Sequence, residues 1–367
     1  MAVVKSNRAV AEIDLRALAS NTRALKRMIG DAMFMAVVKA DAYGHGAVEC
    51  ARAARNAGAD WLGVCFIDEG HELRRAGIEG PILAWLLSES DDLQAAIAAD
   101  IDLSVSSVAE FERVHAAFEA LGRPMQVHIE LDTGLARAGA SPFEWEALFT
   151  RARGVRVISM WSHLANADTP ASPVYDAQRA EFERAVELAA SLGVFPEIRH
   201  MANSAATLSR PEFHYDMVRV GMAMYGVSPM ADADFPFTLS PVMTVRAEVA
   251  QLRDVPAGTG VSYGHRYVTT RDTRLALLPL GYADGLPRAG TNKAPVQLQG
   301  YRYTASGTIC MDQFVVDIGD ANVQIGDQAT IFGAGGPSAR DWADACNTIG
   351  YEITTRIGAR LAKRFID

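Results

Sequence analysis

The stretch from Met35 to Gly46 places a lysine where it could do chemistry. The apolar run Phe34–Val38 predicts a buried strand, and Lys39 follows it where glycines begin to interrupt the chain. Apolar surroundings destabilise the charged form of a lysine, so its pKa falls and the amine can form a Schiff base or act as a general base. A lysine that simply extends into solvent from a strand end is the plainer alternative for Lys39 alone.

Two later segments have groups suited to binding a phosphate. Residues 200–206 and 219–222 combine small residues with a serine hydroxyl and a predicted helix start. Backbone N–H groups at such a start bind anions. Asn203 and Ser204 also fit a simpler role, because either can cap the helix expected from Ala205.

The elements that position these groups form a regular series. Short apolar runs alternate with Ala-, Glu- and Arg-rich stretches of helical character, and they cover residues 34–38, 61–64, 82–85, 103–105, 127–131, 155–161, 198–201 and 217–220. About eight strand–helix units predict a parallel (β/α)₈ barrel of the TIM type. Lys39, Arg137, His163 and Asn203 follow such runs and Arg219 lies near the end of the last one, which is where barrels of this type carry their working residues.

The composition changes around residues 234–241. Beyond them, short alternating apolar segments are broken by Gly and Pro, which predicts a mainly β domain. We therefore expect an α/β barrel domain over residues 1–238 and a C-terminal, mainly β domain over residues 239–367. A short strand at 10–13 and a helix from Leu15, capped by Asp14, precede the barrel series, and residues 342–365 are expected to be helical at least in part.

Charge and composition exclude several classes of protein. The 367 residues have a net charge of −9 and no basic run, which argues against nucleic acid or an anionic membrane as a partner. The longest apolar stretches are too short to span a bilayer, and residues 1–8 lack the apolar core of a signal peptide. We expect a cytoplasmic protein. Its four cysteines lack metal-ligand spacing, so we expect free or core thiols and no metal site.

The segment from Lys39 to Gly46, Lys-Ala-Asp-Ala-Tyr-Gly-His-Gly, resembles the lysine motif of the alanine racemases. The resemblance implies that Lys39 carries pyridoxal 5'-phosphate as a Schiff base, with Tyr43 in the same cofactor site. Further similar segments imply that the cofactor phosphate is bound by a second group of residues, namely Ser204, Gly221, Met222 and Tyr351, next to Asn203.

The resemblance gives Arg219 a more particular role. It implies a guanidinium facing the pyridine nitrogen, supported by His200. A permanent positive charge there disfavours protonation of the nitrogen and weakens the ring as an electron sink. Reprotonation at the α-carbon, and so racemisation rather than transamination, would follow. An arginine that bridges barrel loops is the plainer alternative.

Racemisation needs proton carriers on both faces of the substrate, and Lys39 serves only one. Residues 260–264, Gly-Val-Ser-Tyr-Gly, resemble the family segment whose tyrosine is the second base, here Tyr263, with His163 and Arg219 behind it. The similarity also implies a substrate site formed by Arg137, Met311, Asp312 and Tyr282. Family members are head-to-tail homodimers, so Tyr263, Tyr282, Met311 and Asp312 would act on the partner's cofactor.

The resemblance covers both expected domains and implies interconversion of L-alanine and D-alanine, which supplies D-alanine for bacterial peptidoglycan. A racemase of another small amino acid such as serine is one alternative. A pyridoxal-phosphate carrier is another, but it would be a single domain. A barrel-fold decarboxylase would carry a cysteine in place of Tyr263 and an acid in place of Arg219.

One position departs from the family pattern. Many members have a carbamylated lysine seven residues before the active-site arginine, whereas this chain has Glu130 before Arg137. A glutamate can accept charge-assisted hydrogen bonds from a guanidinium. We expect Glu130 to act as a permanent carboxylate that orients Arg137, an ordinary ion pair at the strand end being the alternative.

Overall fold

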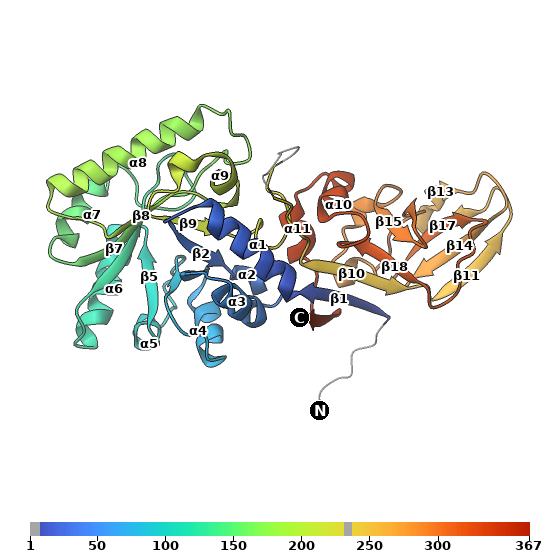
Figure 1. Ribbon diagram of the computed structural model, residues 1–367, viewed down its shortest axis with the longest axis horizontal. Helices are drawn as coiled ribbons and strands as arrows, with labels where there is room; N and C mark the ends of the chain where they lie inside the picture. The colour runs from blue at the N-terminus through green and yellow to red at the C-terminus, as the bar shows by residue number, and fades with distance from the viewer. Residues whose placement is uncertain (1–7, 231–236) are drawn as a thin grey trace.

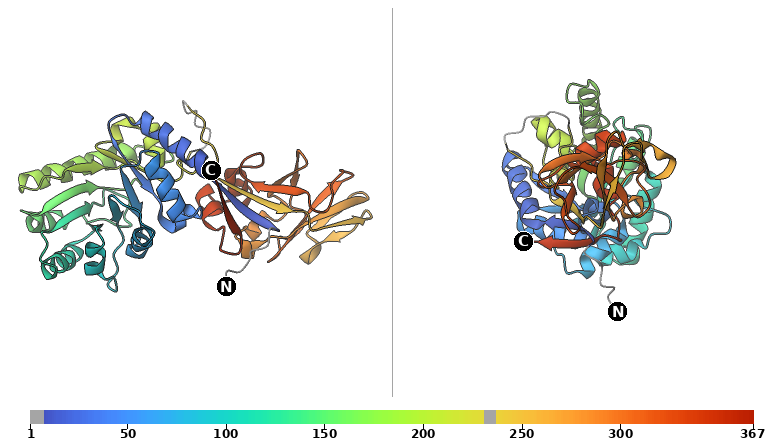
Figure 2. Two further views of the ribbon diagram at one scale, coloured as in Figure 1. Left: turned by 60° about the horizontal axis from the view of Figure 1, so that its bottom comes forward. Right: turned by 90° about the vertical axis from the view of Figure 1, so that its right-hand side faces the viewer.

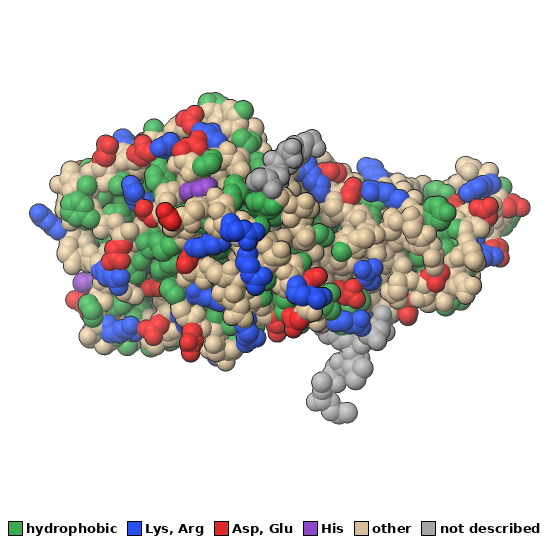
Figure 3. Space-filling model, viewed as in Figure 1, with side chains coloured by type: hydrophobic (Ala, Val, Ile, Leu, Met, Phe, Trp, Pro, Cys, Tyr) green, Lys and Arg blue, Asp and Glu red, His purple; other side chains and the backbone are tan. Residues whose placement is uncertain are grey.

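The computed structural model describes residues 8–230 and 237–367, and it is elongated, with an α/β barrel at one end and a mainly β domain at the other (Figure 1). The expected boundary near residue 238 directly follows residues 231–236, which lie outside the described part, and it stays a prediction. No helix among the described residues is long and apolar enough to cross a membrane. On the face shown in Figure 3, several Lys and Arg side chains adjoin one another near the middle, and elsewhere they are interspersed with Asp and Glu.

Eight parallel strands form the barrel, as the apolar runs predicted. Their order is β8-β7-β6-β5-β4-β3-β2-β9. Hydrogen bonds from Asp216 N to Arg199 O (3.0 Å) and from Arg219 N to Ala202 O (2.9 Å) link the two outer members of this order. The strands are β2 (Met33–Val37), β3 (Trp61–Val64), β4 (Ile82–Ala84), β5 (Ile101–Val105), β6 (Gln126–Glu130), β7 (Arg156–Trp161), β8 (Ile198–His200) and β9 (Met217–Val220).

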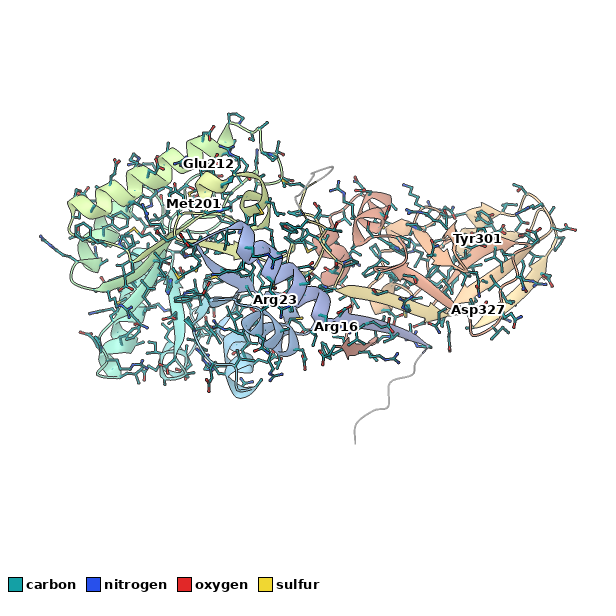
Figure 4. All side chains as sticks on the ribbon, viewed as in Figure 1. Arg16, Arg23, Met201, Glu212, Tyr301 and Asp327 are labelled. Carbon is teal, nitrogen blue, oxygen red and sulfur yellow. The ribbon has the colours of Figure 1, made fainter. Side chains whose placement is uncertain are left out.

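Helices lie on the outside of this barrel and bury one face each against it. In α1 (Leu15–Met28), Leu18 and Leu25 are buried, whereas Arg16 and Arg23 lie on the exposed face (Figure 4). Asp14 caps α1 as expected, accepting the Ala17 N–H at 2.9 Å. The other outer helices of this part are α3 (Ala47–Asn56), α4 (Ile67–Arg75), α5 (Leu93–Ala98), α6 (Val108–Ala120), α7 (Trp145–Ala152), α8 (Val174–Ser191), α9 (Ser204–Ser209) and the 3₁₀ turn η1 (Pro211–Phe213). The short element α2 (Lys39–Tyr43) differs from them, because its residues 40–43 have positive φ angles.

The second domain contains three sheets. The largest has the order β16-β15-β18-β10-β1-β19, the next β11-β14-β17, and the smallest pairs β12 with β13. Their bounds are β1 (Ala9–Asp14), β10 (Met243–Glu248), β11 (Gln251–Val255), β12 (Gly260–Val261), β13 (Tyr267–Val268), β14 (Thr273–Leu278), β15 (Pro295–Leu298), β16 (Tyr301–Thr304), β17 (Phe314–Gly319), β18 (Gln328–Phe332) and β19 (Ala362–Ile366). Short helical elements complete it: α10 (Ala339–Cys346), α11 (Gly350–Thr355), η2 (Tyr263–His265), η3 (Tyr282–Asp284) and η4 (Arg288–Gly290).

The first and last strands of the chain belong together in the largest sheet of the second domain. Strand β1 pairs in parallel with β19 and antiparallel with β10, so the chain begins beside the β domain, forms the barrel and then returns (Figure 2). The expected helical character of residues 342–365 is correct for α10 and α11 but wrong for the end, because residues 362–366 form β19. Pairing with β1 decides that conformation, and no local pattern reveals it.

Candidate active site

A cavity of about 690 Å³ opens at the C-terminal ends of the barrel strands. Lys39 lies in its wall, directly beyond β2. The cavity is also lined by the other residues that the sequence assigned to the barrel part of the site, namely Tyr43, Glu130, Arg137, His163, Asn203, Ser204, Arg219, Gly221, Met222 and Tyr351. The barrel topology and α11 of the second domain, which carries Tyr351, thus bring together residues spread over more than three hundred positions.

The surroundings of Lys39 favour its neutral amine. Burial lowers its pKa first of all, and the positive charges of Arg137 and Arg219 lower it further, whereas Cys65 and Glu69 oppose the shift. Its Nζ lies 5.7 Å from the centre of the Trp85 ring. A larger fraction of neutral amine makes Lys39 a better nucleophile and base near neutral pH.

The chain directly after Lys39 adopts an unusual conformation. Ala40, Asp41, Ala42 and Tyr43 have φ angles of 53°, 52°, 53° and 56°, so four consecutive residues with side chains form a left-handed turn. Each residue in this conformation costs about 1–2 kcal/mol. The turn brings the Tyr43 hydroxyl so close to Gly221 that a Cβ atom on Gly221 would overlap it. A side chain at position 221 would therefore force the Tyr43 ring to move.

The groups at the far wall of the cavity fit a phosphate. The Ser204 hydroxyl oxygen accepts the N–H groups of Gly221 (3.0 Å) and Ala223 (3.3 Å), so its own proton is free to donate. The N–H of Met222 has no acceptor within the described chain. Asn203 has the simpler role that the sequence allowed, because its Oδ1 caps α9 by accepting the Ala205 and Ala206 N–H groups.

Arg219 is buried and held from several sides. Its guanidinium donates to the carbonyl oxygens of Ser162 (2.8 Å), His200 (3.2 Å) and Met201 (3.2 Å), and to Nδ1 of both His200 (3.0 Å) and His163 (3.2 Å). Burial lowers its pKa to about 10, so it stays charged at neutral pH. Burial and the Arg219 charge lower the pKa of His163, to about 3, and that of His200, so both rings are neutral acceptors.

A hydrogen-bonded chain continues from Arg219 into the barrel interior. A guanidinium only donates, so His200 accepts at Nδ1 and carries its proton on Nε2, 3.0 Å from Ser159 Oγ. The Ser159 hydroxyl then donates to His128 Nδ1 at 2.7 Å. His128 is left with an N–H that meets no protein acceptor among the described residues, although its ring makes a T-shaped contact with Trp61. This series of hydrogen bonds fixes the tautomers of His200 and His128.

Glu130 does not have the contact that we expected. It is 4% exposed, and its carboxylate accepts a hydrogen bond from Ser106 Oγ at 3.1 Å, whereas within the described ranges no ion pair joins it to Arg137. Burial raises its pKa to about 7, against the lowering effects of Ser106, Arg219 and Arg137. Burial therefore works against full ionisation of Glu130 near neutral pH, and the expectation of a permanent carboxylate stays a prediction. Any effect of Glu130 on the orientation of Arg137 would therefore be electrostatic, without a direct hydrogen bond.

Several cavity residues escaped the sequence analysis. Cys65 directly follows β3, Trp85 directly follows β4, and Trp161 ends β7, where its ring lies 4.6 Å from the Arg219 guanidinium carbon. The strand-end rule that singled out Lys39 would have found all three. Aromatic and sulfur side chains give a weak signal in the sequence, because most of them are core residues.

Four second-domain residues that were expected in the site do not line this cavity, namely Tyr263, Tyr282, Met311 and Asp312. They gather elsewhere: the Thr308 hydroxyl donates to the Tyr263 carbonyl (2.8 Å), and the Tyr282 N–H donates to the Cys310 carbonyl (3.0 Å) next to Met311. Tyr263 is 74% exposed, Met311 51% and Tyr282 38%. Asp312 forms an ion pair with Arg360 at 2.8 Å. One chain therefore presents two separate groups of candidate site residues.

Comparison with known proteins identifies the family. The model of the alanine racemase N-terminal domain matches residues 13–229, and that of the alanine racemase C-terminal domain matches residues 242–365. An alanine racemase of Frankia casuarinae is 49% identical over 370 residues, covering 98% of this chain and 96% of that protein.

The described residues contain no group of three or more His, Cys, Asp or Glu side chains able to hold a metal ion.

Solved structures agree with this family assignment. The alanine racemase of the D-cycloserine producer Streptomyces lavendulae has a TM-score of 0.96 and 47% identity, covering 98% of this chain and 97% of that one. The alanine racemase of Bartonella henselae, with covalently bound pyridoxal phosphate, has a TM-score of 0.90 and 30% identity, covering 98% and 99%. Fold and cavity thus define an isomerase of the amino-acid racemase class. Within that class, the chain belongs to the alanine racemase family.

Proposed function

We propose that the chain interconverts L-alanine and D-alanine with pyridoxal 5'-phosphate linked covalently to Lys39. The cavity fits this group: the lysine has a lowered pKa, and the free Ser204 proton and Met222 N–H lie together with Tyr43 and Tyr351 for a phosphate. When bound, the cofactor withdraws electrons from the substrate α-carbon. The observation that carries the proposal is this combination of an activated lysine and an anion site in one cavity.

Arg219 and Arg137 both line the cavity, and we expect their positive charges to have different roles. Arg219 keeps its charge because its two imidazole neighbours are neutral, so it would face the pyridine nitrogen and disfavour its protonation. Arg137 lines the cavity without an ion-pair partner within the described part of the chain. A free guanidinium there would bind an anionic oxygen such as the substrate carboxylate.

We further propose a head-to-tail homodimer with a two-base mechanism. Lys39 would move the α-proton on one face of the substrate, and Tyr263 of the second copy would move it on the other. His163, a neutral ring held by Arg219 at Nδ1, carries its proton on Nε2 and can donate to a phenolic oxygen. The support is geometric: Tyr263, Tyr282 and Met311 are exposed together, so a second copy can cover them.

A cytoplasmic location and a supply of D-alanine for peptidoglycan complete the proposal. Serine is the second candidate substrate, because one more small group on a substrate changes the discrimination of a binding site by only about 1–3 kcal/mol. The carrier alternative leaves the whole second domain without a purpose. The decarboxylase alternative predicts an acid where Arg219 lies among imidazoles and carbonyls.

One experiment separates these functions. The protein is incubated with L-alanine in deuterium oxide, and the products are analysed for D-alanine, deuterium at the α-carbon and carbon dioxide. We expect D-alanine labelled at the α-carbon. Carbon dioxide would indicate a decarboxylase, and neither product would indicate a carrier. Borohydride reduction followed by peptide mass mapping should place the cofactor on Lys39, and a label elsewhere would exclude the assignment.

A further inference from the structure

The left-handed turn after Lys39 needs support from its surroundings. Four consecutive positive φ angles at residues with side chains are retained only where neighbouring groups over-determine the backbone. Part of this support is visible on the far side of the turn, where Asp41 accepts the Ala47 N–H at 2.8 Å and forms an ion pair with Lys363 of β19. These contacts hold the end of the turn that lies away from Lys39.

A different side chain holds the end next to Lys39. Glu69 lies in α4, which follows the neighbouring barrel strand β3. Its Oε1 accepts the N–H of Ala40 at 2.6 Å, and its Oε2 accepts the N–H groups of Cys65 (2.8 Å) and Phe66 (3.0 Å). One carboxylate therefore links the chain just after β2 to the chain just after β3. Ala40 is the residue bonded to Lys39, so the link lies one peptide from the reactive lysine.

We propose that Glu69 is a positioning residue for Lys39, holding the lysine backbone against the β3–α4 turn through these three hydrogen bonds. The inference rests on the proposed function, since it concerns the lysine that carries the cofactor. A glutamate is suited to the task because a carboxylate accepts on both oxygens, and each bond to a charged acceptor is stronger than a neutral one. An amide of the same shape cannot serve all three donors.

Helix capping alone does not explain this arrangement. Glu69 is the third residue of α4, and a capping acid at that position needs only to reach the N–H at the helix start, here that of Phe66. The Oε1 bond to Ala40 leaves the helix altogether. The Glu69 charge also acts on the lysine, since it favours the ammonium form of Lys39.

Asp341 of α10 provides a matched control in the second domain. It is likewise the third residue of its helix, and its carboxylate accepts the Ser338 N–H (2.6 Å) and hydroxyl (2.7 Å). The variants Glu69→Gln and Asp341→Asn make the same change from acid to amide at the same helix position. Only the first touches the chain beside Lys39.

The test measures cofactor capture by the apoprotein. Pyridoxal phosphate is mixed with apoprotein over a range of pH, and the rates of capture and of release are followed by absorbance. For Glu69→Gln we expect release to be about tenfold faster, the effect of losing one charge-assisted hydrogen bond, and the pH midpoint of capture to move to lower pH, because the ammonium form loses a favourable charge. Asp341→Asn should match the wild type in both quantities.

A second variant separates geometry from charge. Glu69→Asp keeps the charge but is one methylene shorter, so it cannot span both strand ends. We expect faster release with a pH midpoint close to that of the wild type. If both Glu69 variants release the cofactor at the rate of Asp341→Asn, with an unchanged midpoint, the proposal is wrong. Thermal unfolding of each apoprotein identifies variants that do not fold, and Glu69→Asp then decides the matter alone.

The same samples distinguish a failure of the positioning role of Glu69 from a failure of the proposed function. Borohydride reduction of the loaded wild type should label Lys39. A label on Lys39 together with indifferent Glu69 variants would overturn only the positioning role. If the wild type is not labelled at Lys39, the proposed function fails and the positioning role fails with it.

Discussion

The barrel part and the β-domain part of the proposed site differ in how complete they are. In the barrel cavity, Arg219 and Glu130 are buried among partners: Arg219 has two imidazoles and three carbonyls, and Glu130 has the Ser106 hydroxyl. In the β domain, the phenol of Tyr263 and the side chain of Met311 are mostly exposed. Buried charges must be arranged during folding, because an unpaired one is costly. Exposed apolar groups that lie together on one face are instead typical of a surface that binds a partner.

In the homodimer that we propose, the two parts of the site would be completed at different times. Folding of one chain would complete the lysine and anion site, and association of two chains would bring the second proton carrier to the other face of the substrate. A single chain would then bind the cofactor without racemising alanine.

The largest effect should come from the barrel part. Lys39→Ala removes the covalent link and one proton carrier together, so racemisation should fall by more than about 10³-fold. Chiral chromatography of the alanine product measures this. Lys26→Ala, a lysine of α1 that pairs with Asp60 outside the cavity, is the control and should remain active. Substantial activity in Lys39→Ala would remove the barrel part from the mechanism.

The next prediction combines the two parts in one dimer. Tyr263→Phe should strongly reduce proton exchange from one enantiomer of alanine and much less from the other, as measured by α-deuterium incorporation. Equal mixing of refolded Lys39→Ala and Tyr263→Phe chains should restore about one quarter of the wild-type activity, since half of the dimers are mixed and one of their two sites is intact. If both groups acted within one chain, mixing would restore nothing.

A smaller effect is expected at the pyridine side of the cavity. Arg219→Gln removes the charge among the imidazoles, so racemisation should fall by about 100-fold and a larger share of turnovers should end as pyruvate. Pyruvate formation is followed with a coupled dehydrogenase. Arg199→Gln alters an exposed arginine of the adjacent strand that pairs with Asp216, and it should behave like the wild type. An unchanged product ratio in Arg219→Gln would contradict the assigned role.

The smallest effect concerns the stability of the barrel part. The pKa of Glu130 is raised from 4.5 to about 7, so between these pH values the folded chain holds a proton that the unfolded chain has lost. The contribution of Glu130 to the free energy of unfolding therefore falls as pH rises through this window, by about 3 kcal/mol in total, whereas the lowered pKa values of His163 and His200 act in the opposite direction. Glu130→Gln should remove this dependence, which urea unfolding at pH 5 and pH 8 measures. Glu112→Gln, at an exposed glutamate of α6, should leave it unchanged.

The strands, the strand-end residues and the helix caps could be predicted from short stretches of the sequence. The eight apolar runs gave the barrel strands, and their ends gave Lys39, His163 and Arg219, because in a parallel barrel all such ends lie on one side. The capping of α1 by Asp14 and of α9 by Asn203 followed from side-chain chemistry.

Contacts between distant segments could not be predicted in this way. Pairing of β1 with β19 joins the first and last described strands, and the left-handed turn at 40–43 uses residues that, apart from Asp41, have no local preference for that conformation. The raised pKa of Glu130 likewise depends on burial, which the sequence of β6 alone does not specify. The position of Ser159 between two histidines depends on which barrel strands are neighbours.

The place of β1 in the larger sheet has a consequence for any attempt to divide the molecule. Strand β1 lies between β10 and β19, so a fragment of residues 239–367 would lack an internal strand and leave β19 unpaired. Such a fragment would present a vacant groove whose two edges carry complementary backbone groups. A synthetic peptide of residues 8–14 is the natural occupant of that groove, which makes the β domain a two-piece unit rather than a detachable tail.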